Sequence, residues 1–215
     1  MRRVLCLALS LLVAAPALAA PKPLTPKQEL ARYKKVAKKH GCPAFDAADL
    51  ALPDSWRTPR PALEEHRALR AKTEAPPPPE SGQRLMVYWA GGHLEIVHGS
   101  FAIVRGADGL WRGEGVRTSE IPIRGPNGEP PRPTVTKVAW TLPADDSARM
   151  DALVANPCLA VEPRSIHRMG TIIGGGHTTL EVFDARENRL ASVQHGGSWG
   201  VSGQILNLAF AKAPN

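Results

Sequence analysis

Two cysteines constrain this chain more than any other pair of residues, because a bond between them would tie together segments far apart in the sequence. The 215 residues include three cysteines, Cys6, Cys42 and Cys158. Cys6 lies in a segment that we expect to be removed, which leaves Cys42 and Cys158 as the available pair. A disulfide between them would stabilise the fold by about 4 to 5 kcal/mol through loop-closure entropy. Two free thiols would remain if the geometry kept them apart.

Residues 1–19 have the layout of a secretory signal peptide. Arg2 and Arg3 give a positive start, the apolar run Val4–Ala15 follows, and Pro16-Ala17-Leu18-Ala19 is a small-residue cleavage pattern. The run is shorter than the roughly 20 residues that span a bilayer, and we expect no transmembrane segment elsewhere. The sequence therefore predicts an exported protein of the periplasm or extracellular space, where disulfides persist.

The basic charge is concentrated near the N-terminus. Residues 21–72 hold twelve Lys and Arg against six acids, whereas residues 73–215 hold thirteen against fourteen. A basic segment can indicate nucleic acid, but exported proteins rarely meet it and aromatic side chains for base stacking are scarce here. We therefore expect no nucleic-acid partner. The remaining alternatives are a solvated basic helix and attraction to an anionic surface through Lys34, Lys35, Lys38 and Lys39.

A helix over Pro26–His40 carries the clearest local signals. Thr25 and Gln28 match a capping box, Pro26 occupies the first helical position, and Gly41 provides a stop. A shorter helix is expected over residues 62–72, and four prolines at 76–79 predict a semi-rigid strap. Residues 20–80 are thus interpreted as a basic helical segment joined to the rest by a Pro-rich linker.

Residues 81–215 are predicted to form an α+β domain with an antiparallel meander sheet and two or three helices. Short β-rich runs at 84–89, 93–98, 101–105 and 110–116 are divided by glycine turns at 90–92, 99–100 and 106–109. The later elements expected are a strand at 134–142, a helix at 144–155, a hairpin at 178–195, and a closing helix or strand at 203–212.

The residues capable of chemistry do not converge on a metal or cofactor motif. His93 and His98 are five residues apart on one expected strand, so their side chains would point to opposite faces. Neither a metal-binding spacing nor a phosphate-binding glycine frame is present. We therefore predict no metal site and no cofactor.

One serine motif leaves a hydrolase as the alternative function. Gly196-Gly197-Ser198-Trp199-Gly200 formally matches a nucleophile elbow, and a hairpin turn centred between Glu187 and Asn188 would set Ser198 opposite His177 and His195 opposite Leu180. The elbow normally needs an acid and a histidine later in the chain, and neither follows Gly200. We favour a glycine turn with Trp199 as an anchor, and retain His177, Ser198 and Trp199 as candidate binding residues.

The order of elements over residues 84–212 resembles the small emfourin-like inhibitors of thermolysin-type proteases. The resemblance is carried by strands around Gly91-Gly92, by Trp140-Thr141-Leu142 leading into Asp151-Ala152-Leu153, and by Thr179-Leu180-Glu181-Val182. The N-terminal helix, the Pro-rich segment and both cysteines depart from that family, and no functional residue carries over. The resemblance implies a secreted inhibitor.

Small size, the export signal and the lack of a convergent catalytic set favour a non-enzymatic protein. We expect it to bind a macromolecule or an envelope component, with inhibition as one form of such binding. A small serine-dependent hydrolase that uses His177 and Ser198 is the alternative.

Overall fold

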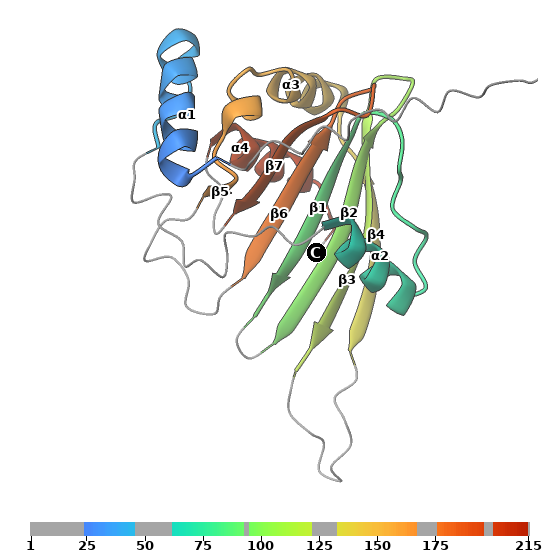
Figure 1. Ribbon diagram of the computed structural model, residues 1–215. Helices are drawn as coiled ribbons and strands as arrows, with labels where there is room; N and C mark the ends of the chain where they lie inside the picture. The colour runs from blue at the N-terminus through green and yellow to red at the C-terminus, as the bar shows by residue number, and fades with distance from the viewer. Residues whose placement is uncertain are drawn as a thin grey trace, which may run out of the picture.

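A seven-stranded sheet is the centre of the molecule (Figure 1). The computed structural model describes residues 24–45, 62–92, 95–121, 133–166, 176–195 and 200–214. The strand order is β4-β3-β2-β1-β6-β7-β5, and every neighbouring pair is antiparallel except β5 with β7. The strands are β1 (Arg84–Gly91), β2 (Ile96–Arg105), β3 (Trp111–Glu120), β4 (Thr134–Thr141), β5 (Ser165–Ile166), β6 (His177–Phe183) and β7 (Arg189–His195). The predicted α+β class and the antiparallel meander are confirmed.

Four α-helices in the described residues cover the two faces of the sheet unequally. They are α1 (Pro26–His40), α2 (Ala62–Lys72), α3 (Ala144–Val154) and α4 (Gly200–Phe210), with a short 3-10 helix η3 (Leu159–Val161). The main core joins one face of the sheet to α1, α3 and α4, whereas α2 packs on the other face through Leu69, Tyr88 and Val116. In Figure 1, α2 lies in front of the strands and α4 lies behind them. The closing segment at 203–212, for which the sequence left helix and strand as alternatives, lies mostly in the helix α4.

The predicted turn at Gly99-Ser100 is wrong, because these residues lie in the middle of β2. Gly99 pairs with Trp89 on one side and with Arg117 on the other. A Cβ at Gly99 would come within 2.4 Å of the Phe101 ring, so glycine is needed here for close packing and not for a turn. The two short strands predicted on either side of Gly99 are therefore one long strand. Of the two histidines expected on it, His98 lies on β2 and His93 lies outside the described residues.

The disulfide predicted between Cys42 and Cys158 is present, and it fastens α1 to the body. Their Cα atoms are 5.7 Å apart. The helix itself has the predicted ends, since Thr25 and Gln28 form the capping box and Gly41 takes the left-handed conformation at φ 65°. Tyr33 is 1% exposed and donates a 2.6 Å hydrogen bond from its hydroxyl to the Pro43 carbonyl. The apolar side of α1 is therefore packed against the rest of the protein, with Tyr33 buried and Leu30 and Ala37 half-buried.

The hairpin of β6 and β7 has a different register from the one the sequence suggested. His195 pairs with Thr178 and not with Leu180, so the pairing is displaced by two residues. A register irregularity at Val182 and Phe183 and a turn closed by the Asp184 carboxylate, which accepts from the Asn188 backbone N–H at 2.9 Å, account for the displacement. The expected centre of the turn, between Glu187 and Asn188, was wrong.

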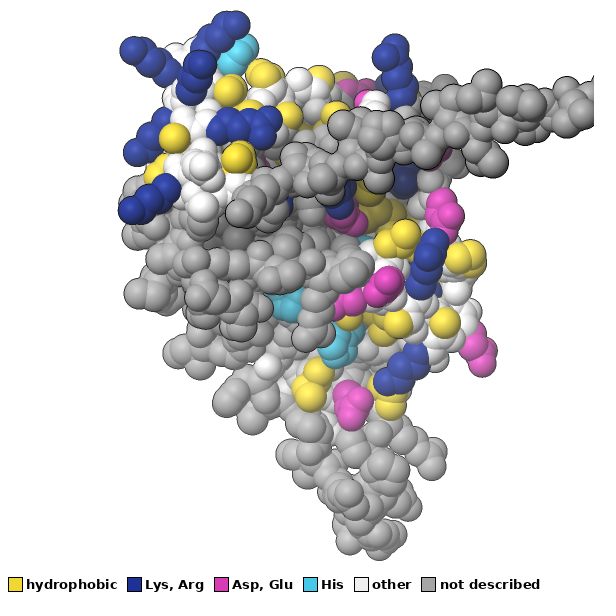
Figure 2. Space-filling view, viewed as in Figure 1, with side chains coloured by type: hydrophobic (Ala, Val, Ile, Leu, Met, Phe, Trp, Pro, Cys, Tyr) yellow, Lys and Arg dark blue, Asp and Glu magenta, His cyan; other side chains and the backbone are white. Residues whose placement is uncertain are grey.

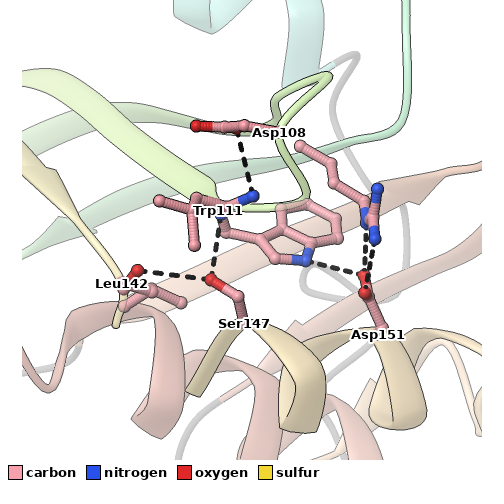
Figure 3. A network of polar contacts seen from close by, with 7 residues as sticks. Asp108, Trp111, Leu142, Ser147 and Asp151 are labelled. Carbon is pink, nitrogen blue, oxygen red and sulfur yellow. Dashed lines mark hydrogen bonds and ion pairs between the residues drawn. The ribbon is translucent and has the colours of Figure 1, made fainter. Parts of the chain in front are cut away.

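A polar network fixes α3 against the ends of β2, β3 and β4 (Figure 3). The Asp151 carboxylate accepts hydrogen bonds from Arg105 Nε at 2.7 Å and from Trp111 Nε1 at 2.9 Å. The Ser147 hydroxyl accepts from the Trp111 backbone N–H and donates to the Leu142 carbonyl. Bonding to Arg105 lowers the pKa of Asp151, which keeps its charge in place. Trp111, which is fully buried, thus has all its polar atoms satisfied.

Candidate functional site

The exposed side of α1 carries a dense group of cations, which we call the basic arc (Figure 2). Because Leu30, Tyr33 and Ala37 face the core, the helical period places the Lys and Arg side chains of α1 outward. None of these cations forms an ion pair with a residue in the described part of the chain. The basic arc consists of the exposed residues Lys27, Arg32, Lys34, Lys35, Lys38 and Lys39.

The one acidic residue of α1 does not neutralise the basic arc. Glu29 pairs instead with Arg164, with 3.4 Å between the carboxylate and the Arg164 Nε. Burial raises the pKa of Glu29, while Arg164 and Arg32 act in the opposite direction. The carboxylate therefore serves the junction between α1 and the segment before β5. The cations of the basic arc remain available to an external anion.

A second candidate is an open groove on the main core face of the sheet, which we call the α4 groove. Its volume is about 560 Å³, within the range of small-molecule sites, about 300–1,000 Å³. The end of α4 and the residues after it form one wall, and strands β1, β2, β3, β4 and β6 form the floor. The described lining residues are Val87, Trp89, Phe101, Arg117, Thr136, Val138, Thr178, Leu206, Asn207, Phe210, Ala211, Ala213 and Pro214.

The aromatic floor of the α4 groove depends on small residues beside it. A Cβ on Gly115 would lie 2.3 Å from the Phe101 ring, so the glycine allows the ring to lie close to β3. Phe101 then packs edge-on against Phe210, with ring centroids 5.0 Å apart. The Trp140 indole N–H donates to the Ala209 carbonyl at 2.8 Å, which fixes the end of α4 over the sheet. The groove is therefore built from fixed elements.

A buried polar cluster lies on the opposite face, beneath α2. His66 Nδ1 is 2.7 Å from the Ser100 hydroxyl, and Arg70 Nε donates to the same hydroxyl at 2.9 Å. Burial, with a smaller contribution from Arg70, lowers the pKa of His66 to about 4. His66 and Ser100 are both 0% exposed. A substrate could not reach this serine–histidine pair while α2 stays in place, so we assign it to the attachment of α2.

The candidate residues from the sequence are distributed differently. His177 lies on β6, where it pairs with Ala90 on β1 and is half-buried. Ser198 and Trp199 lie outside the described residues, as do residues 1–19. The displaced hairpin register removes the reason for aligning Ser198 with His177. Cys42 and Cys158 form the predicted disulfide, and Lys34, Lys35, Lys38 and Lys39 are all exposed.

Neither a metal-ligand cluster nor a membrane-spanning helix is found in the described part of the chain. No group of three or more His, Cys, Asp or Glu side chains there is arranged to hold a metal ion. Among the helices described, none combines the length and the apolar character needed to cross a membrane.

The α4 groove and the buried cluster were not found from the sequence. Both depend on β2 being one continuous strand, which aligns Gly99 with Trp89 and Arg117 on one face and leaves Ser100 on the other. A prediction that treated Gly99 as part of a strand would have found the alignment. Comparison with models of protein families, with curated proteins and with solved structures gave no match.

Proposed function

We propose that this chain is an exported, non-enzymatic protein that binds an anionic component of the cell envelope, namely a membrane surface rich in acidic phospholipids. The observation that carries the proposal is the orientation of α1. Its apolar side is engaged with the core, and its six basic residues face outward. The disulfide holds the end of the helix in place, which fits a protein of an oxidising compartment.

The charge distribution supports a peripheral mode of binding. Each Lys or Arg near an anionic surface contributes about 1 kcal/mol, so the basic arc as a whole can supply a substantial attraction. Tyr33 of α1 is buried in the core and Leu30 and Ala37 pack against it, which leaves little apolar surface on the helix to insert between lipid tails. Binding would therefore be electrostatic, reversible and weakened by salt.

The test is co-sedimentation of the purified protein with lipid vesicles. We expect binding to vesicles that contain phosphatidylglycerol, little binding to pure phosphatidylcholine vesicles, and release at high salt. Replacing Lys34, Lys35, Lys38 and Lys39 together by Glu should weaken binding by about a hundredfold or more.

A matched control reverses four exposed cations outside α1: Lys72, Arg149, Arg186 and Lys212. This variant has the same net charge as the α1 variant, so it separates a local docking surface from attraction by overall charge. Retained binding by the control supports the proposal. Equal losses in both variants, or binding that does not respond to salt, would contradict it.

Inhibition of a protease remains a proposal that rests on the resemblance of residues 84–212. Incubation of the protein with a thermolysin-type protease and measurement of peptide cleavage would test it directly. Unchanged cleavage at a large molar excess would remove this form of the binding function.

A further inference from the structure

We infer that the α4 groove binds an amphiphile with one anionic head group and an apolar chain, such as a long-chain carboxylate. This site is separate from the basic arc and does not depend on the function proposed for α1. The inference starts from the strand register, which sets an apolar row of side chains beside a polar row on the floor of the groove.

The apolar row consists of Val87, Phe101 and Val138. Val87 pairs with Phe101, Phe101 with Gly115, and Gly115 with Val138, so these residues cross β1, β2, β3 and β4 in one line. Leu206 and Phe210 of α4 add further apolar surface from the wall of the groove. Val87, Phe101 and Leu206 are buried, whereas Val138 and Phe210 are half-buried. This end of the groove suits a hydrocarbon chain.

On each of these strands, the polar row lies two residues away from the apolar row. Thr136 pairs with Arg117, Arg117 with Gly99, Gly99 with Trp89, and Trp89 with Thr178. At Gly99 the Phe101 ring, and not open space, lies between Arg117 and Trp89, since a Cβ there would come within 2.4 Å of that ring. The row therefore presents a guanidinium, two hydroxyls and an indole N–H at the outer end of the apolar row.

Charge determines which head group fits. Arg117 is exposed, and it is the one charged residue among the described lining residues. It forms no ion pair with any described residue, and the lining that the structure describes contains no acid. Arginine is the side chain best suited to bind a carboxylate through two parallel hydrogen bonds. An anionic head at Arg117 and a chain directed toward Phe101 and Phe210 would use both rows at once.

The test is isothermal titration calorimetry of the whole protein, purified after export, with three amphiphiles that share a twelve-carbon alkyl chain. These are dodecanoate, dodecanol and dodecyltrimethylammonium, each kept below the concentration at which it forms micelles. We expect dodecanoate to bind most tightly and dodecyltrimethylammonium least. Equal affinity for all three, or no binding of dodecanoate, would overturn the inference.

Two variants locate the site. Arg117→Gln should weaken dodecanoate binding about five- to tenfold and leave dodecanol unchanged, because it removes one charged hydrogen-bonding partner. Val138→Glu adds an acid to the exposed edge of the groove and should weaken dodecanoate more than dodecanol. Arg149→Gln, on an exposed part of α3, is the control for loss of a positive charge.

The binding results are decisive only for variants that fold. The folding of each variant is therefore checked by circular dichroism and thermal unfolding. If Arg117→Gln folds and binds dodecanoate like the unmodified protein, the anionic head does not lie at Arg117 and the inference fails.

Discussion

The imidazole of His66 is enclosed between α2 and the sheet, where it contacts Ser100 and the Tyr88 ring. Its Nε2 is buried and has no hydrogen-bond partner in the described residues. A positive charge here would lie in a buried site beside the Arg70 guanidinium, and burial and this guanidinium together lower the pKa of His66 to about 4. The folded protein therefore retains His66 in its neutral form.

We predict that His66 makes the protein less stable in acid. The pKa of His66 is about 4 in the folded state and about 6.5 in an unfolded chain, so the unfolded chain binds one more proton between these values. The free energy of unfolding should fall as the pH drops from about 6.5 to 4, by about 2 to 3 kcal/mol from this residue. The measurement is urea unfolding at neutral pH and near pH 4.5.

His66→Gln provides the comparison, because glutamine can still bond to the Ser100 hydroxyl but does not titrate. The variant should lose less stability on acidification than the unmodified protein. Buried Glu162, whose pKa is raised by desolvation, contributes with the opposite sign, but it is present in both proteins and cancels from the difference. Parallel losses in the two proteins would show that His66 is not responsible.

The contacts of the His66 side chain could not be predicted from the sequence. His66 and Ser100 are 34 residues apart, and neither local periodicity nor motif spacing indicates how a helix will lie across a sheet. Residues whose partners are close in the sequence had roles that could be predicted. Thr25, Gln28 and Gly41 act within one or two turns of the same helix, where backbone geometry alone defines the partner.

At the scale of elements, the disulfide ties the segment that follows α1 to the start of η3. Its two cysteines are 116 residues apart in the chain, and such a loop restricts the unfolded state strongly. Replacing both Cys42 and Cys158 by Ser should lower the free energy of unfolding by about 2 to 5 kcal/mol. The measurement is guanidinium unfolding of the variant beside the oxidised protein.

The same variant should also expose α1 to proteases. Tyr33 still anchors the helix through Pro43 and through the Phe45 ring, 4.8 Å away between centroids, but the covalent constraint is lost. Limited trypsin digestion should then cut at the lysines of the basic arc sooner than in the oxidised protein. Adding a reductant should have this effect on the unmodified protein alone. Identical unfolding midpoints and digestion rates would contradict the prediction.

Elements with local end signals were predicted with accurate bounds, and those defined by packing were not. The helices Pro26–His40 and Ala62–Lys72 match the expected ranges. β2 was divided in two, because Gly99 resembles a turn residue unless the position of the Phe101 ring is known. The closing segment at 203–212, most of which lies in α4, was left as helix or strand, since α4 is buried on most sides and shows little amphipathic pattern.

For the whole molecule, the basic arc and the α4 groove lie toward opposite ends of the strand order. α1 packs on η3, which in turn contacts β7, whereas the groove lies over β1 to β4 and β6. Sites without shared residues usually act independently. We therefore predict that reversing the four lysines of α1 changes dodecanoate affinity by less than about twofold.

The reciprocal measurement uses Arg117→Gln in the vesicle assay, where binding should also stay within about twofold of the unmodified protein. A tenfold change in either direction would indicate that the two surfaces are coupled or that one of them is misassigned. Neither the α4 groove nor its separation from α1 could be predicted, because both require the register of four successive strand pairs.

The pairing of β1 with β6 also has a consequence for how the chain is made. Val87 meets Leu180 at the middle of the sheet, so the central strand gains its second neighbour only when residues from the last fifth of the chain have arrived. Sheets that depend on such distant pairings fold slowly. The proposed export of the chain in an extended form would benefit from that delay, because the sheet cannot be completed before almost all of the polypeptide has been synthesised.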